Sequence, residues 1–295
     1  ELACRGVWPH PRGEVRHVAP SALRPQLVFT VHNNREGFGA TLWDLGEGEG
    51  APGLQERCRL PLERGRVTEV VWAPDGLGEK AASLGEAGAA VWDLGGGRPV
   101  KAAACSAAEA PGHLAGAWDP HTPTTLALST PAGIALHDNR SLEQVAELSG
   151  GHATWARGLE YSRALPHALV SCGDDCCFCV WDTRKVSRPV VRVQAHSHWL
   201  WAANPNPSHP GLIVTGSSDT LVCLWSLRGL RDAFKAGGEP AATCEGPAAT
   251  FDHHEDSVYA VAWSRSNPWL LASLSGDGRV ICHRVPDACR YGLLL

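Results

Sequence analysis

The stretch SCGDDCCFCVWDTR, Ser171 to Arg184, holds the pattern that decides the fold, because its Trp-Asp pair is repeated along the chain. Intact or degenerate copies of the pair stand at Trp43-Asp44, Trp92-Asp93, His137-Asp138, Trp181-Asp182 and Trp225-Ser226. Neighbouring copies are 44 to 49 residues apart. Several copies in phase indicate one supersecondary unit repeated along the sequence, whereas a lone Trp-Asp pair would indicate nothing.

The segments between these pairs are typical of short β-strands. HALVSC, FCVWD, LIVTG, LVCLW, LLASL and RVICHRV are apolar, β-branched or aromatic, and Gly, Asp or Pro separates them. They show no sustained helical periodicity. A period near 44 residues that ends in Trp-Asp is typical of the WD40 repeat. The sequence therefore predicts an all-β fold, a WD40 β-propeller in which each repeat is one blade.

The last three repeats share a finer register before their terminal aromatic residue. A His, a Ser or Thr and an Asp precede that residue in this order, and their spacing is the same in all three repeats. The sets are His152/Ser171/Asp175/Trp181, His196/Thr215/Asp219/Trp225 and His254/Ser273/Asp277/His283. A sixth repeat therefore ends at His283, where the other two have Trp.

We interpret these sets as structural tetrads, although Ser, His and Asp are also the residues of a hydrolase triad. A catalytic site occurs once, but this set occurs once per blade. The buried indole N–H needs an acceptor, and the hydroxyl can accept it and bond onward to the His. The His can then donate to the Asp, so every buried polar group is paired. The alternative is a hydrolase that uses His254, Ser273 and Asp277.

The register is weaker elsewhere in the chain. The same offsets before Trp92 give Ala82 and Glu86, and alanine has no hydroxyl to accept the indole N–H. We therefore expect the N-terminal blades to depend on packing rather than on this network. The interval between Trp225 and His283 is longer than the other intervals, which predicts a loop insertion at 227–250, a segment rich in Gly and Ala.

Composition argues against several other classes of protein. The chain has 295 residues and a formal net charge of −5, which gives no footprint for nucleic acid or an anionic membrane. No run reaches the ~18 apolar residues of a membrane span. No phosphate-loop glycine motif is present, and HHEDS (253–257) fits no zinc signature. We expect no cofactor, no metal, no small-molecule substrate and no catalytic residue.

The cysteines are expected to be reduced thiols that pack as small apolar residues. Eleven cysteines in a chain of this length do not suggest a disulfide framework. In the opening stretch, Cys177 and Cys179 alternate along one strand, Cys176 lies in the turn and Cys172 lies on the preceding strand. Four thiolates around one tetrahedral ion would need a tighter knuckle than this hairpin offers.

Two pairs of residues are candidates for partner binding. Trp155 and Trp199 each lie three residues after the tetrad His, where the chain enters the first strand of a blade. They can form one interaction patch, or they can pack on neighbouring loops. Arg140 and Arg184 are 44 residues apart and therefore also equivalent. They can form a basic docking point, or each can pair with the Asp two residues before it.

Four longer segments resemble one family of WD-repeat proteins. They are LVSCGDDCCFCVWDTR (169–184), HSHWLW (196–201), LIVTGSSD (212–219) and HEDSVYAVAWSRSNPWLLASLSGDGRVICHRVP (254–286). Joined, they closely resemble the EARP- and GARP-complex-interacting WD-repeat proteins. The resemblance implies a propeller that is seven-bladed in the intact family, with six repeats and a partial edge visible in this chain. We expect residues 1–295 to be a single WD40 domain from which an N-terminal blade is missing.

The same resemblance implies an adaptor without enzymatic activity. Its implied partners are subunits of the EARP and GARP tethering complexes, and its implied location is cytoplasmic, peripheral at endosomes and the trans-Golgi network. There it would support endosomal recycling and dense-core vesicle sorting. The alternative is a substrate receptor of a cullin-type ubiquitin ligase, because HDNR and WDTR, which end at Arg140 and Arg184, are similar to the Trp-Asp-x-Arg boxes of such receptors.

Overall fold

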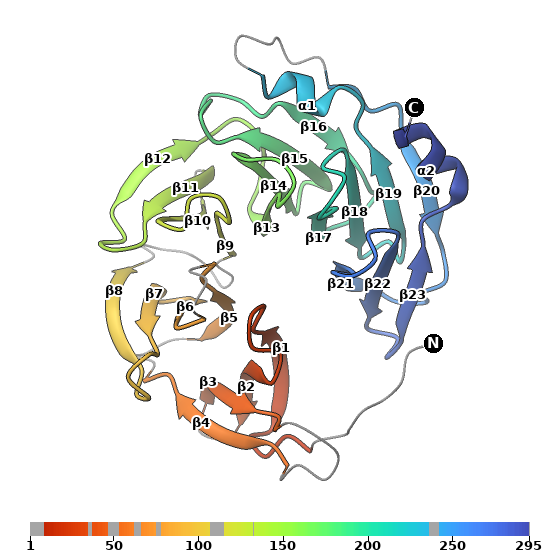
Figure 1. Cartoon of the computed structure of the whole chain (residues 1–295). Coiled ribbons are helices and arrows are strands. Elements are labelled where there is room, and N and C mark those ends of the chain that lie inside the picture. Colours follow the sequence, from red (N-terminus) through yellow and green to blue (C-terminus); the bar gives the residue numbers. More distant parts are fainter. Residues whose placement is uncertain are drawn as a thin grey trace. The chain divides into compact units, whose positions relative to one another are not determined.

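The computed structural model describes residues 9–34, 37–46, 53–61, 66–74, 78–106, 115–131, 133–235 and 242–294. These residues form six antiparallel β-sheets, five of four strands and one of three, with two short helices (Figure 1). The all-β prediction is therefore confirmed, and each repeat forms one antiparallel sheet, which we call a blade. The chain divides into two units, of which unit 1 is Glu1–Leu114 with Asp138–Glu143 and unit 2 is Ala115–His137 with Gln144–Leu295.

Unit 1 holds two four-stranded meanders, in which the strands pair in chain order. Blade 1 contains β1 (Glu14–Pro20), β2 (Leu27–Asn34), β3 (Gly37–Asp44) and β4 (Gln55–Arg59). Blade 2 contains β5 (Val67–Trp72), β6 (Lys80–Gly85), β7 (Gly88–Asp93) and β8 (Val100–Ser106). Their shared core is built from fully buried Phe29, Val31 and Val70, together with Trp92.

Unit 2 holds most of blade 3 and the whole of blades 4 to 6. Blade 3 contains β9 (Gly116–Trp118), β10 (Thr125–Thr130), β11 (Gly133–Asp138) and β12 (Gln144–Leu148). Blade 4 contains β13 (Ala156–Tyr161), β14 (Ala168–Gly173), β15 (Cys177–Asp182) and β16 (Val191–Gln194). Blade 5 contains β17 (Leu200–Pro205), β18 (Leu212–Ser217), β19 (Val222–Ser226) and β20 (Pro247–Phe251). Blade 6 has three strands in the described residues, β21 (Val258–Trp263), β22 (Leu270–Ser275) and β23 (Val280–Arg284).

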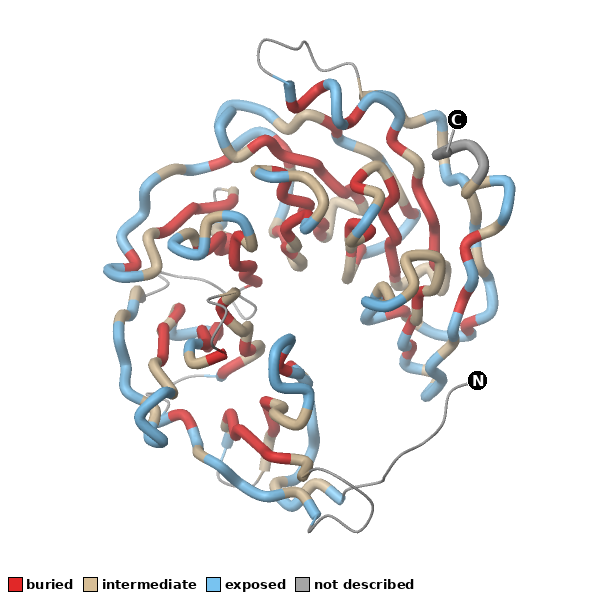
Figure 2. The backbone as a smooth tube through the Cα atoms, in the orientation of Figure 1, coloured by how far each residue is buried: buried red, intermediate tan, exposed pale blue. Residues whose placement is uncertain are grey.

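Burial follows the order of the strands within a blade (Figure 2). Every residue of β14 and β15 is buried, whereas the fourth strands β12, β16 and β20 are largely exposed. The middle strands are covered on both faces and read as continuous apolar runs, because blades pack face to face. Apolar residues of blades 4 and 5 share one core that includes Phe178 and Trp225, whose rings are 5.5 Å apart.

The expected loop at 227–250 is partly structured. It contains α1 (Leu230–Ala233), a bridge between Arg228 and Thr243, and the start of β20 at Pro247. Residues 236–241 lie outside the described part of the chain. A second helix, α2 (Asp287–Leu294), follows β23. Neither α1 nor α2, the helices of the described residues, has the length and apolar character needed to cross a membrane.

The first strand of five blades carries a β-bulge near its start. In each case the register with the second strand skips one residue, and the extra residues are Arg16, Thr68, Arg157, Trp201 and Tyr259. A bulge leaves its extra residue out of the ladder and re-aims its side chain. The bulged residues are therefore turned differently from the rest of each strand.

Candidate functional site

The tetrad residues of blade 4 are connected by hydrogen bonds from the indole to the carboxylate. The Trp181 indole N–H donates to Ser171 Oγ over 2.8 Å, and that hydroxyl bonds to His152 Nε2 over 2.7 Å. His152 Nδ1 lies 2.9 Å from Asp175 Oδ1. Because a carboxylate can only accept, Nδ1 carries the proton and Nε2 accepts from the Ser hydroxyl. The chain of bonds joins the loop before β13, the strand β14 and the turn before β15.

Blade 5 repeats this arrangement. Trp225 Nε1 donates to Thr215 Oγ1 over 2.8 Å, and Thr215 Oγ1 lies 2.8 Å from His196 Nε2. His196 Nδ1 lies 2.9 Å from Asp219 Oδ2.

Blade 6 uses His283 in place of the indole. Ser273 Oγ lies 2.7 Å from both His254 Nε2 and His283 Nε2, and His254 Nδ1 lies 2.9 Å from Asp277 Oδ2. One hydroxyl proton serves one imidazole, so His283 must donate its own Nε2–H to Ser273 as a Trp would.

The tetrad carboxylates also fix the loop that precedes the first strand. A backbone N–H of this loop donates to the carboxylate in each blade, from Ala153, Ser197 and Glu255, over 3.1 Å in every case. Burial alone would raise the pKa of Asp175, but hydrogen bonds from His152, Ala153 and Arg192 outweigh it and hold that pKa at about 2. The carboxylate therefore stays ionised at neutral pH and keeps the loop in place.

This geometry does not suit a hydrolase. Ser273 is 1% exposed, and its oxygen is enclosed between two imidazole rings that take up its donor and one lone pair. A nucleophile must be open to the substrate it attacks. The His254/Ser273/Asp277 set is thus the blade 6 member of a repeated network rather than an exposed catalytic site.

The residue before the tetrad His contacts the terminal ring and differs between blades 4 and 6. In blade 4 that residue is Gly151, and a Cβ there would lie 2.2 Å from the Trp181 ring. In blade 6 the equivalent residue is His253, whose ring centroid is 5.7 Å from that of His283. The residue beside the terminal ring is thus larger in blade 6 than in blade 4, whereas blade 5 has Ala195 at this position and keeps Trp225.

Blades 1 and 2 also pair their Trp with a hydroxyl, so our expectation that packing replaces the network there was wrong for the indole N–H. Trp43 Nε1 donates to Thr30 Oγ1 over 2.8 Å, and Trp92 Nε1 donates to Ser83 Oγ over 2.9 Å. In blade 1, His10 Nε2 lies 2.9 Å from the same Thr30 oxygen. Thr30 lies farther from its Trp, and Ser83 nearer to its Trp, than the hydroxyl residues of blades 4 to 6, so the shared offset misses both.

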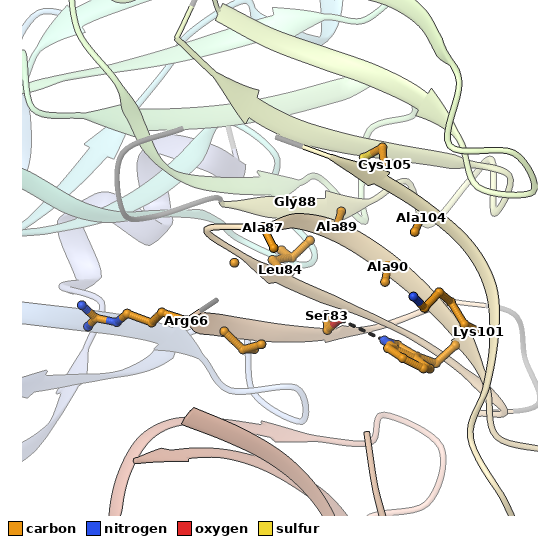
Figure 3. Close-up of a pocket in the computed structure, with 13 residues that line it drawn as sticks. Arg66, Ser83, Leu84, Ala87, Gly88, Ala89, Ala90, Lys101, Ala104 and Cys105 are labelled. Atoms are coloured by element: carbon orange, nitrogen blue, oxygen red, sulfur yellow. Dashed lines mark hydrogen bonds between the residues drawn. The ribbon is translucent and has the colours of Figure 1, made fainter. Parts of the chain in front are cut away.

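Blade 2 has a hollow of about 90 Å³ on one face, lined by small residues that include Gly88, Ala89 and Ala104 (Figure 3). The Ser83 hydroxyl in its wall already accepts the bond from the Trp92 indole. The Cys105 thiol also lines the hollow, and burial raises its pKa, which opposes formation of the nucleophilic thiolate. Ligand pockets are typically about 300–1,000 Å³, so this hollow is small and has no activated nucleophile.

Three of the four cysteines of the opening stretch, Cys172, Cys177 and Cys179, are buried free thiols, and Cys176 is partly exposed. Burial raises the pKa of Cys172 to about 12 and also raises the pKa of Cys177 and Cys179. A raised pKa opposes the thiolate form that a metal or a redox reaction needs. Within the described ranges, no group of three or more His, Cys, Asp or Glu side chains is placed to hold a metal ion.

Arg140 and Arg184 each pair with the Asp two residues before. Arg140 Nη2 lies 2.6 Å from Asp138 Oδ2, and Arg184 Nη2 lies 2.8 Å from Asp182 Oδ2. The two pairs differ in burial, because the Asp182 side chain is fully buried and Asp138 is 24% exposed. Arg184 also donates to the Phe234 carbonyl over 2.8 Å, which ties the turn after β15 to the end of α1.

The two tryptophans proposed as a partner patch have different surroundings. Trp155 is half-buried, and no ring contact joins it to Trp199 in the described part of the chain. Trp199 is 46% exposed and belongs to a different cluster, which we call the aromatic patch: Arg157, Trp199, Trp201 and Tyr259. Three of its four members are the bulged residues of β13, β17 and β21. The sequence shows these residues but not the bulges that bring them together.

Contacts within the aromatic patch run from blade 4 to blade 6. The Arg157 guanidinium carbon lies 4.9 Å from the centroid of the Trp201 ring, which is edge-on to Trp199 at 6.2 Å. The Trp201 and Tyr259 centroids are 5.3 Å apart. Offset aromatic pairs at such distances and a cation over an indole are both attractive. The patch is therefore one continuous surface over three blades of unit 2.

Comparison with known proteins supports the same class of fold. A family described as EIPR1 beta-propeller matches residues 1–225, and the WD domain, G-beta repeat matches residues 245–283. The chain is thus a WD40 β-propeller protein.

Its relatives identify the family within that class. It is 33% identical over 332 residues to EARP and GARP complex-interacting protein 1 of Rattus norvegicus, covering 99% of this chain and 86% of the relative. The Homo sapiens protein of the same name is 33% identical over 333 residues with the same coverage. WD repeat-containing protein DWA2 of Arabidopsis thaliana is 30% identical over 303 residues, 97% of this chain and 83% of the relative. The chain belongs to the EIPR1 β-propeller family, which confirms the resemblance drawn from the sequence.

Proposed function

We propose that this chain is a non-enzymatic scaffold that associates with the EARP and GARP complexes. The observation that carries the proposal is its 33% identity, over 99% of its length, to proteins named for interacting with those complexes. As a finer proposal, it acts at endosomes and the trans-Golgi network, in endosomal recycling and dense-core vesicle sorting.

The geometry of unit 2 supports binding rather than catalysis. The recurrent His, Ser and Asp residues are enclosed by one another and fix loops, as in His152, Ser171 and Asp175. The aromatic patch, in contrast, leaves Trp199 and Tyr259 about half exposed. Exposed aromatic residues on a rigid support are typical of protein-interaction surfaces.

Affinity purification of the tagged full-length chain from cells, followed by mass spectrometry, tests the proposal. We expect the subunits of EARP and GARP to be enriched over a tagged, unrelated WD40 propeller. Recovery of a cullin-ligase adaptor instead, with loss of that adaptor in Arg140→Ala/Arg184→Ala, would support the ligase-receptor alternative. Recovery of neither set would contradict the proposed scaffold.

A further inference from the structure

We propose that the aromatic patch binds a positively charged segment of a partner protein, in which Lys or Arg side chains lie beside apolar ones. The inference deepens the proposed function and rests on it, because it assigns the surface and the chemistry through which a scaffold of this family holds its partner. It is argued from the exposure, rigidity and charge of the patch.

The patch exposes more aromatic surface than isolated side chains would. Trp199 is 46% exposed and Tyr259 is 50% exposed, and the half-buried Trp201 ring lies between them. The bulges of β17 and β21 turn Trp201 and Tyr259 away from the alternation of their strands. A contiguous exposed aromatic surface of this kind marks an interaction site more often than scattered single residues do.

The patch is rigid before any partner arrives. Arg157 forms a two-pronged ion pair with Asp174, in which Nη2 donates to Oδ2 over 2.9 Å, and this holds the guanidinium against Trp201. The Trp201 indole N–H donates to Ser218 Oγ over 2.6 Å, and Ser257 Oγ donates to the same oxygen over 3.1 Å. A surface ordered in advance loses less side-chain entropy on binding, which favours affinity.

The charge around the patch selects the sign of the partner. Asp256 lies next to Tyr259, since a Cβ on Gly276 would be 2.9 Å from Asp256 Oδ2 and 3.2 Å from Tyr259 Cε2. The Asp256 carboxylate accepts a hydrogen bond from the Ser257 N–H over 2.6 Å, but it takes part in none of the ion pairs of the described residues. The charge of Glu255, the residue before it, is offset by an ion pair with Arg279, so Asp256 supplies the negative charge beside Tyr259.

A cationic side chain fits this arrangement and an anionic one does not. Arg157 occupies the Trp201 face, but in the described part of the chain no cation lies over the Tyr259 ring. A Lys or Arg of the partner can place its charge over that ring and against Asp256, while its neighbours pack on Trp199. A phosphate or an acidic segment over the Tyr259 ring would meet the Asp256 carboxylate and be repelled.

The test measures binding by the full chain to two probes. The first is the purified EARP complex, and the second is an array of 12-residue peptides that contains basic, acidic and neutral sequences with and without aromatic residues. Trp199→Ala and Tyr259→Ala remove exposed rings, Tyr259→Phe keeps the ring, and Asp256→Lys reverses the charge. Val145→Ala, at a 63% exposed site on β12, and Asp232→Asn, at an exposed carboxylate on α1, are the matched controls.

We expect the full chain to select, from the array, peptides in which basic residues lie beside apolar ones. The Trp199→Ala, Tyr259→Ala and Asp256→Lys variants should each bind both the complex and the selected peptides at least tenfold more weakly than the parent. Tyr259→Phe and the two controls should bind within twofold of the parent. If the complex binds but the three patch variants bind it equally well, the inference is wrong while the proposed scaffold stands. If the complex does not bind at all, the proposed function fails, and the array alone decides the inference: selection of acidic peptides, or of none, overturns it.

Discussion

Blades 4 to 6 of unit 2 and blades 1 and 2 of unit 1 satisfy the same buried group in different ways. In unit 2, one hydroxyl serves both the indole or imidazole and the tetrad His, and that His is held by an Asp. In blade 2, Ser83 accepts from Trp92 with no His bonded to it among the described residues. In blade 1, His10 reaches Thr30, but its Nδ1 accepts a hydrogen bond from the Arg12 N–H instead of donating to an Asp.

The difference teaches what the complete tetrad adds. A Trp and a hydroxyl join two strands of one sheet, whereas the His and Asp extend the bonding to the loop before the first strand. In unit 2 the residue that follows this loop begins the strand whose bulge supplies the aromatic patch, as Leu200 precedes Trp201. The tetrads therefore fix the loops that precede the strands of the proposed binding surface, and so help to position its aromatic side chains.

The largest expected effect compares Ser171→Ala in blade 4 with Ser83→Ala in blade 2. Ser171→Ala leaves the Trp181 indole N–H and the His152 Nε2 atom without a partner, although His152 Nδ1 keeps Asp175, whereas Ser83→Ala leaves only the Trp92 indole N–H unpaired. A buried polar group left unsatisfied costs about 1–3 kcal/mol. The loss in free energy of unfolding, measured by urea denaturation, should be about twice as large for Ser171→Ala.

Ser171→Thr is the matched control, because Thr215 holds the equivalent position in blade 5. It keeps the hydroxyl and should retain most of the stability. Equal losses for Ser171→Ala and Ser83→Ala would mean that the His and Asp add nothing to the simple pair.

The second effect sharpens the comparison within unit 2. Burial, with His253 and His254 nearby, lowers the pKa of His283 to about 4 from its ordinary 6.5. As the pH falls, His283 therefore becomes protonated near pH 6.5 in the unfolded chain but only near pH 4 in the folded chain. This group contributes stability that is fully present above pH 6.5 and is lost as the pH falls toward 4. Part of the fall in melting temperature between pH 7.5 and 4.5 should come from His283.

The double variant His253→Gly/His283→Trp copies the Gly151 and Trp181 arrangement of blade 4. It should melt at a less pH-dependent temperature than the parent, while His253→Gly alone should keep most of the acid sensitivity, because burial is the largest cause of the lowered His283 pKa. Other histidines with lowered pKa, such as His196, are common to all three proteins, so the difference isolates His283. An unchanged pH profile in the double variant would refute the assignment.

The smallest effect compares Arg184→Ala in unit 2 with Arg140→Ala in unit 1. Removing Arg184 leaves the fully buried Asp182 carboxylate without its cation, and an uncompensated buried charge is costly. We expect its melting temperature to fall by about 2–4 °C, the shift that about 1 kcal/mol gives in a domain of 150–250 residues. Arg140 is 76% exposed, and its removal should leave the melting temperature unchanged within error. Equal shifts in melting temperature for the two variants would mean that burial of the Asp182 carboxylate does not make its ion pair more important for stability.

The repeat spacing was sufficient to predict the propeller and the tetrads of blades 4 to 6, because those hairpins have the same length. It missed Thr30 and Ser83 because the hairpin between the second and third strands is three residues longer in blade 1 and one shorter in blade 2, which shifts the hydroxyl. It found Trp199 but not the other members of the aromatic patch. A bulge depends on how two strands pair, and no residue type in β13, β17 or β21 predicts where it lies.

Hydrogen exchange of the full chain, measured with and without the purified EARP complex, tests most directly whether unit 2 carries the binding surface. We predict that the complex slows exchange of backbone amides at 197–202 and 255–260, around Trp199 and Tyr259, and leaves those around the bulged Arg16 and Thr68 of unit 1 unchanged. Protection confined to unit 1, or binding of the complex with no protection in those two segments, would contradict the account.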